Sequence, residues 1–448
     1  MDKLFGTDGI RGVDGQFPLD FSSIYTLGFA LSGLLLGEGL EPRLLIGRDT
    51  RESGPRIERA LVRGIRDCGG DAASAGVIPT SAISILTRKY KLSAGIVISA
   101  SHNPYHDNGI KIFSSQGIKI PEEWEARLEK EIRAGGRKVV KKSVQIATDT
   151  TYTEDYIAFL KSSVDLSRSG KKWKVALDCA NGASSAIAPR IHRELGIEVV
   201  VIHCHPDGKN INLGCGSLHP QGLARKVLDA GCDLGIAYDG DADRAIWVDE
   251  RGRILNGDHT LFVQAVSMSG RGRLKGGKVV ATILSNMGLE VALQKRDLKL
   301  LRTQVGDKYV LDRMLGEGAN LGGEQSGHTI FLDNCPTGDG ILTGLKMLAV
   351  MHETGLPLSK LAEELEEFPQ THLNIRVGRK IDFDEFPEIV QVRTEIESLL
   401  DGQGRLELRY SGTEPLARIM VEGRDKAEIK SYARKMGAVI ENYLGQKT

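Results

Sequence analysis

The segment GIVISASHNP, residues 95–104, places a polar turn directly after a strongly apolar run. Four of its first six residues are aliphatic, which is typical of a strand buried on both faces. The segment then changes to Ser-His-Asn-Pro, which are residue types common in turns. We therefore expect Ser101 at an exposed loop tip, at the end of a buried strand.

The same order of strand and polar turn recurs along the chain. Three segments run from a strand into a small or polar turn and then a helix: RLLIGRDTRESG (43–54), WKVALDCANGAS (173–184) and KVVATILSNMGL (278–289). A second strand follows each of them and ends in an unusual loop: SASHNP (99–104), YDGDADR (238–244) and GGEQSGH (322–328). Because open α/β sheets bind ligands at the carboxyl ends of their strands, we expect three α/β units with one such loop each.

The last part of the chain breaks this pattern. THLNIRVG is a predicted strand, GRLELRYSGTEPLARIMVEG is two predicted strands around a turn, and helices are expected at 383–400 and 425–444. The order β-α-β-β-α indicates a separate α+β domain. The prediction is three similar α/β domains with mixed or parallel sheets plus this C-terminal domain, with limits 1–152, 153–253, 254–368 and 369–448.

Composition limits the kinds of partner. The chain has 448 residues, with 59 basic and 59 acidic side chains and a net charge of zero, which argues against nucleic acid as a main partner. The six cysteines are scattered without a C-x-x-C pair, and the N-terminus does not resemble a signal peptide, so we expect reduced thiols and a cytoplasmic protein. The most apolar stretch, 24–37, is too short to span a membrane.

The loop YDGDADR carries three alternating carboxylates, Asp239, Asp241 and Asp243. In a tight loop they can converge on one hard cation, although a solvated acidic turn is the plainer interpretation. An EF-hand is rejected because its sixth position is Arg244 and the flanking segments are strands. An aspartyl phosphatase, in which the first aspartate is the nucleophile, stays open at this point.

Other loops offer groups for a phosphorylated sugar. Ser101 can carry a covalent phosphoryl group, and Lys111 follows it in YHDNGIK. The loop GGEQSGH offers a carboxylate and a hydroxyl for sugar hydroxyls, as well as an imidazole: Glu324, Ser326 and His328. Each stretch also fits an ordinary turn when it is read alone.

The segment RYSGTEPLAR has the composition of a phosphate cradle. Two arginines, two hydroxyls and the backbone N–H groups of a tight turn suit a phosphate group, although a plain hairpin is the simpler interpretation. The residues are Arg409, Ser411, Gly412, Thr413 and Arg418. At the N-terminus, FGTDGIRG places Arg11 in a glycine-flanked loop that can reach a cleft or lie on the surface.

The order of FGTDGIRG, SASHNP, DGDADR, GEQSGH and RxSGTEP resembles the α-D-phosphohexomutase superfamily over essentially the whole chain. The resemblance implies four domains around a central cleft, with one active-site loop from each. Within the superfamily, NINLGCGSLHP, VGDKYV, GEQSGH and TGDGI resemble the phosphoglucosamine mutase branch. Ala242, Ser81, Leu218 and Tyr410 depart from the usual pattern, and Tyr410 leaves the substrate range less certain than the reaction.

The resemblance also implies roles for these residues. Ser101 is the phosphoserine, and one Mg²⁺ per active site is held by Asp239, Asp241, Asp243 and a serine phosphate oxygen. Arg11, Lys111 and His328 match positions near the reacting groups. The substrate-binding set is Arg244, Glu324, Ser326, Arg409, Ser411, Gly412, Thr413 and Arg418.

The implied reaction interconverts glucosamine 6-phosphate and glucosamine 1-phosphate through a sugar 1,6-bisphosphate, and feeds UDP-N-acetylglucosamine and cell-wall precursor synthesis. Glucosamine or glucose 1,6-bisphosphate would be the intermediate and activator. A mutase for glucose or mannose phosphates, a metal-dependent phosphatase and a silent sugar-phosphate binder are the alternatives. A homodimer and a kinase that first phosphorylates Ser101 are further partners left open.

Overall fold

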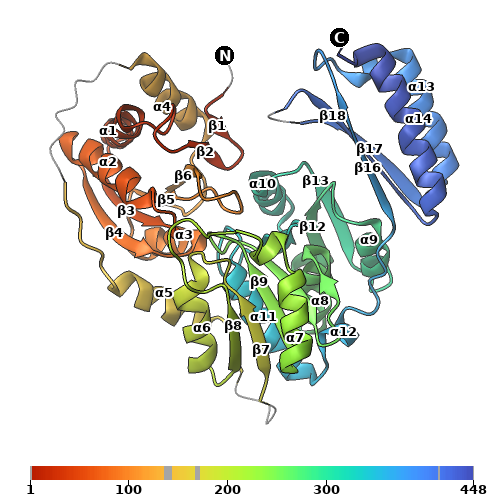
Figure 1. Ribbon diagram of the computed structural model, residues 1–448, viewed down its shortest axis with the longest axis horizontal. Coiled ribbons are helices and arrows are strands. Elements are labelled where there is room, and N and C mark those ends of the chain that lie inside the picture. The colour runs from red at the N-terminus through yellow and green to blue at the C-terminus, as the bar shows by residue number, and fades with distance from the viewer. Residues whose placement is uncertain (1–2, 136–143, 167–171, 412–413, 447–448) are drawn as a thin grey trace. The chain divides into compact units, whose positions relative to one another are not determined.

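The computed structural model describes residues 3–135, 144–166, 172–411 and 414–446 (Figure 1). The chain divides into two compact units. The N-terminal unit comprises Met1–Leu284 and Asp297–Glu363, and the C-terminal unit comprises Ser285–Arg296 and Glu364–Thr448. Among the described residues, no helix has both the length and the apolar character needed to cross a membrane.

The first sheet of the N-terminal unit is mixed and has the strand order β1-β2-β6-β5-β3-β4. Its strands are β1 (Phe5–Gly6), β2 (Gly9–Val13), β3 (Arg43–Arg48), β4 (Asp71–Val77), β5 (Ala94–Ile98) and β6 (Asp107–Ser114). Strand β3 pairs in parallel with β4 and β5, and β6 pairs antiparallel with β5 and β2. All residues of β5 are buried, as the apolar run that precedes Ser101 predicts.

The helices associated with this sheet are α1 (Phe21–Gly37), α2 (Gly54–Asp67), α3 (Thr80–Lys89), α4 (Glu122–Ala134) and α5 (Thr151–Ser162). Helix α1 begins where the Asp20 carboxylate accepts hydrogen bonds from the N–H groups of Ser22 and Ser23. Helices α1 and α2 pack closely because each has a glycine at the contact. A Cβ at Gly28 would lie 2.4 Å from the Leu61 carbonyl oxygen.

The second sheet has the strand order β11-β10-β9-β7-β8. Its elements are β7 (Lys174–Asp178), β8 (Glu198–Ile202), β9 (Leu234–Tyr238), β10 (Ala245–Asp249), β11 (Ile254–Leu255), α6 (Ser184–Glu194), α7 (Gln221–Ala230) and the short 3₁₀ helix η1 (Gly216–Leu218). Strand β7 pairs in parallel with β8 and β9, and β9 pairs antiparallel with β10. The acidic loop therefore joins two neighbouring antiparallel strands.

The third sheet has the strand order β13-β12-β14-β15. Its elements are β12 (Lys278–Thr282), β13 (Lys299–Thr303), β14 (Leu321–Gly323), β15 (Thr329–Phe331), α8 (Gly257–Gly270), η2 (Lys275–Gly277), α10 (Asp307–Glu317), α11 (Gly340–Thr354) and α12 (Leu358–Leu361). As in the first two sheets, the loop of interest joins an antiparallel pair, β14 and β15. The expected similarity of the three units is thus visible in their topology.

The C-terminal unit is an antiparallel sheet with helices packed against it (Figure 1). Its elements are α9 (Met287–Gln294), β16 (Gln370–Arg376), η3 (Phe383–Glu385), α13 (Pro387–Leu400), β17 (Gly404–Tyr410), β18 (Leu416–Gly423) and α14 (Lys426–Leu444). The strand order is β16-β18-β17, and the chain order β-α-β-β-α after residue 369 confirms the predicted α+β domain. The four exact domain limits stay predictions.

Helix α9 belongs to the C-terminal unit although it precedes that unit's sheet by many residues. The fully buried Glu422 of β18 accepts hydrogen bonds from Met287 N at 2.9 Å and Arg405 Nε at 2.6 Å. The Asn286 amide bonds both backbone groups of Phe368 at 2.9 Å. These contacts fix the helix to the sheet through buried polar groups, which the sequence pattern did not reveal.

Candidate active site

Ser101 lies beyond the end of β5 in a left-handed backbone conformation, with φ at +51°. Its Oγ donates a hydrogen bond to Asp239 Oδ2 at 2.6 Å, and His102 Nδ1 lies 3.4 Å from the same Oγ. The expectation of an exposed loop tip is wrong, because only 1% of Ser101 is exposed. The burial comes from the acidic loop, which is far away in sequence and covers the hydroxyl.

Two polar side chains fix the Ser101 loop from its backbone side. Arg51, which is fully buried and paired with Asp49, donates to the Ser101 carbonyl oxygen at 3.2 Å and to the Asn103 carbonyl oxygen at 2.6 Å. Asn212 Nδ2 donates to the same two oxygens at 2.8 and 3.0 Å. Arg51 and Asn212 lie in quoted motifs, but their role was missed because it depends on contacts between distant segments.

The three aspartates after β9 come together as the sequence predicts. Asp239, Asp241 and Asp243 are all buried, and each offers a carboxylate oxygen within 4.8 Å of the others. Gly240 is required between them, since a Cβ there would lie 2.6 Å from the Ser101 carbonyl oxygen. The loop thus presents its carboxylates to the serine hydroxyl at close range.

The charges and orphaned oxygens of this cluster fit a divalent cation. Among the described residues, Asp241 Oδ1 and Asp243 Oδ1 are buried without a hydrogen-bond partner. Burial and the neighbouring carboxylates of Asp243 and Asp241 raise the pKa of Asp239 well above its usual value. A hard cation would bind the orphaned oxygens and relieve this repulsion, so the donor set suits Mg²⁺.

A buried lysine neutralises part of the acidic cluster. Lys111 Nζ lies 2.9 Å from Asp241 Oδ2, 3.4 Å from Asp243 Oδ2 and 3.0 Å from Asp8 Oδ2. Burial opposes its charge, but these carboxylates prevail and raise the pKa of Lys111 well above its usual value. Lys111 therefore stays cationic within the acidic cluster.

Asp8 connects Lys111 to two further cationic side chains, Arg11 and Lys119. It pairs with Arg11, whose Nη1 donates to Asn103 Oδ1 at 3.1 Å, and accepts from Lys119 Nζ at 2.9 Å. Lys119 also donates to Asp307 Oδ1 at 2.7 Å. Sequence reasoning singled out Arg11 and missed Asp8, Lys119 and Asp307, although GTDGIRG and VGDKYV contain two of them.

The loop between β14 and β15 is held beside the acidic loop. A backbone bridge joins Arg244 to His328, and the Arg244 side chain lies between Asp239 and Asp243 at 4.0 and 3.8 Å. Glu324 accepts from the Gly306 N–H at 3.2 Å, and burial raises its pKa. Ser326 is exposed. These contacts thus connect Arg244 with Asp239 and Asp243 and bring His328 next to Arg244, whereas Ser326 makes no hydrogen bond or ion pair to the acidic loop in the described part of the chain.

The predicted phosphate cradle lies in the C-terminal unit. Arg409 of β17 and Arg418 of β18 are directly opposite each other, and Arg418 Nη2 donates to Ser411 Oγ at 3.2 Å and Glu414 Oε2 at 2.8 Å. Burial and the charge of Arg418 lower the pKa of Arg409. Like charges placed opposite each other are unfavourable, and an anion would relieve them. Gly412 and Thr413 lie outside the described residues.

Comparison with known proteins accounts for this set of loops. Residues 2–138, 154–252 and 256–368 match the models of phosphoglucomutase/phosphomannomutase alpha/beta/alpha domains I, II and III, and residues 373–438 match the C-terminal domain of the same family. The chain is 44% identical to a phosphoglucosamine mutase of Geotalea daltonii, over 99% of both chains. It is 45% identical to one of Syntrophotalea carbinolica, over 100% of this chain and 99% of the relative.

Solved structures share the fold of this chain. A phosphoglucomutase/phosphomannomutase family protein of Burkholderia thailandensis has a TM-score of 0.81 at 22% identity, covering 99% of this chain and 98% of the other. This chain belongs to the phosphoglucomutase/phosphomannomutase family, as its motifs indicate. It is a phosphohexomutase, an enzyme that moves a phosphoryl group between two positions of a sugar.

Proposed function

We propose that this enzyme interconverts glucosamine 6-phosphate and glucosamine 1-phosphate. The contact between Ser101 Oγ and Asp239 Oδ2, at 2.6 Å within a buried acidic cluster, is the observation that carries the proposal. It places a hydroxyl suited to carry a phosphoryl group next to carboxylates that could hold a divalent cation, and such a cation would neutralise the charge of the phosphoryl group. Amino-sugar specificity is supported by full-length relatives named phosphoglucosamine mutase at 43–45% identity.

The metal in this proposal is one Mg²⁺ held by Asp239, Asp241, Asp243 and a phosphate oxygen on Ser101. When bound, it would neutralise negative charge on the transferring phosphoryl group. The orphaned oxygens of Asp241 and Asp243 support this assignment. A fungal N-acetylphosphoglucosamine mutase, from Aspergillus fumigatus, has been solved in complex with GlcNAc-6P and magnesium.

In the first half-reaction, phosphorylated Ser101 donates its phosphoryl group to the C1 hydroxyl of glucosamine 6-phosphate. The bond between phosphorus and Ser101 Oγ breaks, a bond from phosphorus to the sugar oxygen forms, and the proton of the C1 hydroxyl ends on Ser101 Oγ. The product is a sugar 1,6-bisphosphate. Lys111 stays charged within the acidic cluster that contacts Ser101, and Asp8 pairs with both Lys111 and Arg11, so we propose that both cations stabilise the transferring group. His328 is proposed to lie near the reacting groups.

In the second half-reaction, the bisphosphate turns around and its 6-phosphoryl group returns to Ser101, which releases glucosamine 1-phosphate. Arg244, Glu324 and Ser326 are proposed to orient the sugar. The phosphate that is not reacting would be held by Arg409, Ser411, Gly412, Thr413 and Arg418. The opposed arginines of β17 and β18 support this role.

The wider setting follows from the reaction. The product would feed UDP-N-acetylglucosamine and cell-wall precursor synthesis in the cytoplasm. Glucosamine or glucose 1,6-bisphosphate would restore enzyme that has lost its phosphoryl group; a serine-to-alanine variant of the fungal enzyme has been solved with glucose 1,6-bisphosphate. A homodimer and a kinase acting first on Ser101 stay predictions.

A comparison of substrates tests the proposal. We expect the highest kcat/KM with glucosamine 6-phosphate, measured beside glucose and mannose 6-phosphates with the purified, phosphorylated enzyme. Product analysis should find the isomeric sugar phosphate and no stoichiometric release of inorganic phosphate. A higher kcat/KM for glucose or mannose phosphate would assign the enzyme to that sugar instead.

A further inference from the structure

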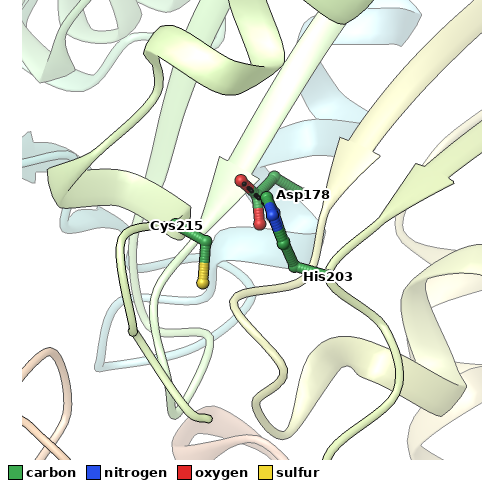
Figure 2. A group of neighbouring side chains, drawn as sticks. All are labelled: Asp178, His203 and Cys215. Carbon is green, nitrogen blue, oxygen red and sulfur yellow. Dashed lines mark ion pairs between the residues drawn. The ribbon is translucent and has the colours of Figure 1, made fainter.

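A second group of metal-binding side chains lies in the second α/β domain, apart from the acidic loop. It consists of Asp178 at the end of β7, His203 just after β8, and Cys215 just before η1 (Figure 2). The reaction proposed above uses none of them. Three different donor types therefore meet at one point from three separate segments of the chain.

The spacing of these donors suits a small metal ion. One potential ligand atom from each residue lies within 4.8 Å of the other two, and His203 Nδ1 is 3.0 Å from Asp178 Oδ2. Zinc bonds of about 2.0–2.3 Å in a tetrahedral site place ligand atoms roughly 3.3–3.8 Å apart. To reach that spacing, the distance from His203 Nδ1 to Asp178 Oδ2 must lengthen slightly, and any separation near the 4.8 Å limit must shorten.

Backbone groups hold the carboxylate in place without saturating it. Asp178 Oδ1 accepts from Ala180 N at 2.9 Å, and Oδ2 accepts from Gly216 N at 3.0 Å. An ionised carboxylate has about four acceptor positions, so two backbone bonds leave room for a metal. Carboxylates that bind metals are commonly oriented by such outer hydrogen bonds.

The donor set favours a transition metal over Mg²⁺. Thiolate and imidazole ligands select zinc-like ions, whereas Mg²⁺ prefers the all-oxygen set that the acidic loop offers. Asp178 and Cys215 are buried, while 38% of the His203 side chain is exposed, which gives an ion a path to the site and a place for a water ligand.

We propose that Asp178, His203 and Cys215 form a second metal site in this enzyme, which takes Zn²⁺. The loop between His203 and Cys215 contains Asn212, which bonds the Ser101 and Asn103 carbonyl oxygens. A metal that ties both ends of this loop to Asp178 would stiffen the support of the phosphoserine loop. The site thus has a positioning role that is independent of which sugar the enzyme prefers.

Two neighbouring histidines provide a matched test. His203 has φ at +47°, a conformation that Asn tolerates well, so His203→Asn removes the ligand with little backbone strain. His205→Asn changes an exposed histidine two residues away that is outside the cluster and serves as the control. Cys215→Ser, with Cys232→Ser as its buried control in the same domain, removes the sulfur donor.

The experiment titrates the metal-free, full-length protein with Zn²⁺ and, separately, Co²⁺, with Mg²⁺ in excess to occupy the acidic loop. We expect one tightly bound Zn²⁺ and a near-ultraviolet sulfur-to-cobalt charge-transfer band, which the oxygen-only acidic loop cannot produce. His203→Asn should weaken binding at least about 10-fold, and Cys215→Ser should abolish the band, while both controls behave as wild type.

Two results would overturn the second site. One is binding that is equally strong in His203→Asn and His205→Asn, which would mark it as adventitious. The other is a folded wild-type protein that shows no sulfur-to-cobalt band at saturating Co²⁺. Circular dichroism of each variant confirms that a lost signal does not come from unfolding.

Discussion

The acidic loop after β9 and the two opposed arginines of β17 and β18, Arg409 and Arg418, are held in place by different kinds of contact. The acidic loop is buried and fixed by contacts with distant residues, including Thr80 at 2.6 Å and Lys111 at 2.9 Å from Asp241 Oδ2. The two arginines lie on antiparallel strands, where Arg418 is partly exposed and pairs with the nearby Glu414. In the proposed reaction, the buried acidic loop would serve the bond-breaking step, and the more exposed arginines would hold a phosphate that must be bound and released in either orientation.

The largest effect is expected at Ser101, whose hydroxyl contacts the acidic loop. Ser101→Ala should lower kcat at least about 10⁴-fold, because the covalent carrier of the phosphoryl group is lost. Steady-state mutase assays measure the loss. Ser99→Ala is no control, because Ser99 Oγ bonds the Ser101 N–H, so exposed Ser162→Ala on α5 is used instead. Near-normal turnover in Ser101→Ala would remove the serine from the mechanism.

The second-largest effect is expected from Asp241→Asn. It replaces one of three carboxylates of the cluster and should lower both turnover and the apparent Mg²⁺ affinity by about 10–100-fold. Mg²⁺ titrations of activity measure both quantities, with Asp229→Asn on the exposed face of α7 as the control. An unchanged Mg²⁺ titration curve would contradict the ligand assignment.

Arg409→Lys tests the opposed arginines of β17 and β18. Lysine keeps the charge but loses the planar fork, so kcat/KM should fall by about 10-fold. The variant should also release bisphosphate during turnover, so its activity should decay and return when glucose 1,6-bisphosphate is added. Progress curves with and without bisphosphate measure this, with exposed Arg434→Lys on α14 as the control. Wild-type rates without a bisphosphate requirement would show that these arginines do not form the cradle.

The smallest effect is expected at Asn212, which supports the Ser101 loop by two hydrogen bonds. Glycine accepts the observed φ of +58° at position 212, so Asn212→Gly removes both hydrogen bonds to the Ser101 loop without straining the backbone. The free energy of unfolding should fall by about 1 kcal/mol, because the two carbonyl groups each lose one hydrogen bond but keep Arg51 as a donor. Chemical denaturation measures it, beside Leu213→Ala at a position that is 75% exposed. Equal stability of the two variants would assign no support to Asn212.

The difference between local spacing and contacts between distant segments explains how much of the site could be predicted from the sequence. The carboxylates of Asp239, Asp241 and Asp243 converge through local spacing, so a short motif predicted them. The strand before Ser101 was equally clear, but the burial of Ser101 was not, since it depends on Asp239 from another domain. The clamp by Arg51 and Asn212, and the chain of charges from Lys111 through Asp8 and Lys119 to Asp307, were missed for the same reason. Contacts between distant segments leave no periodic pattern in a single sequence.

The fate of the phosphoryl group on Ser101 tests the central claim most directly. Phosphorylated enzyme is mixed with glucosamine 6-phosphate for a single turnover, and protein and sugar are then analysed by mass spectrometry, with peptide mapping of the protein. The protein should begin heavier by one phosphoryl group on Ser101, and after the first half-reaction this group should be found in glucosamine 1,6-bisphosphate. After a completed turnover it should be found in glucosamine 1-phosphate, with Ser101 phosphorylated again by the former 6-phosphoryl group. A phosphoryl group mapped to another residue, or recovered as inorganic phosphate, would contradict the account.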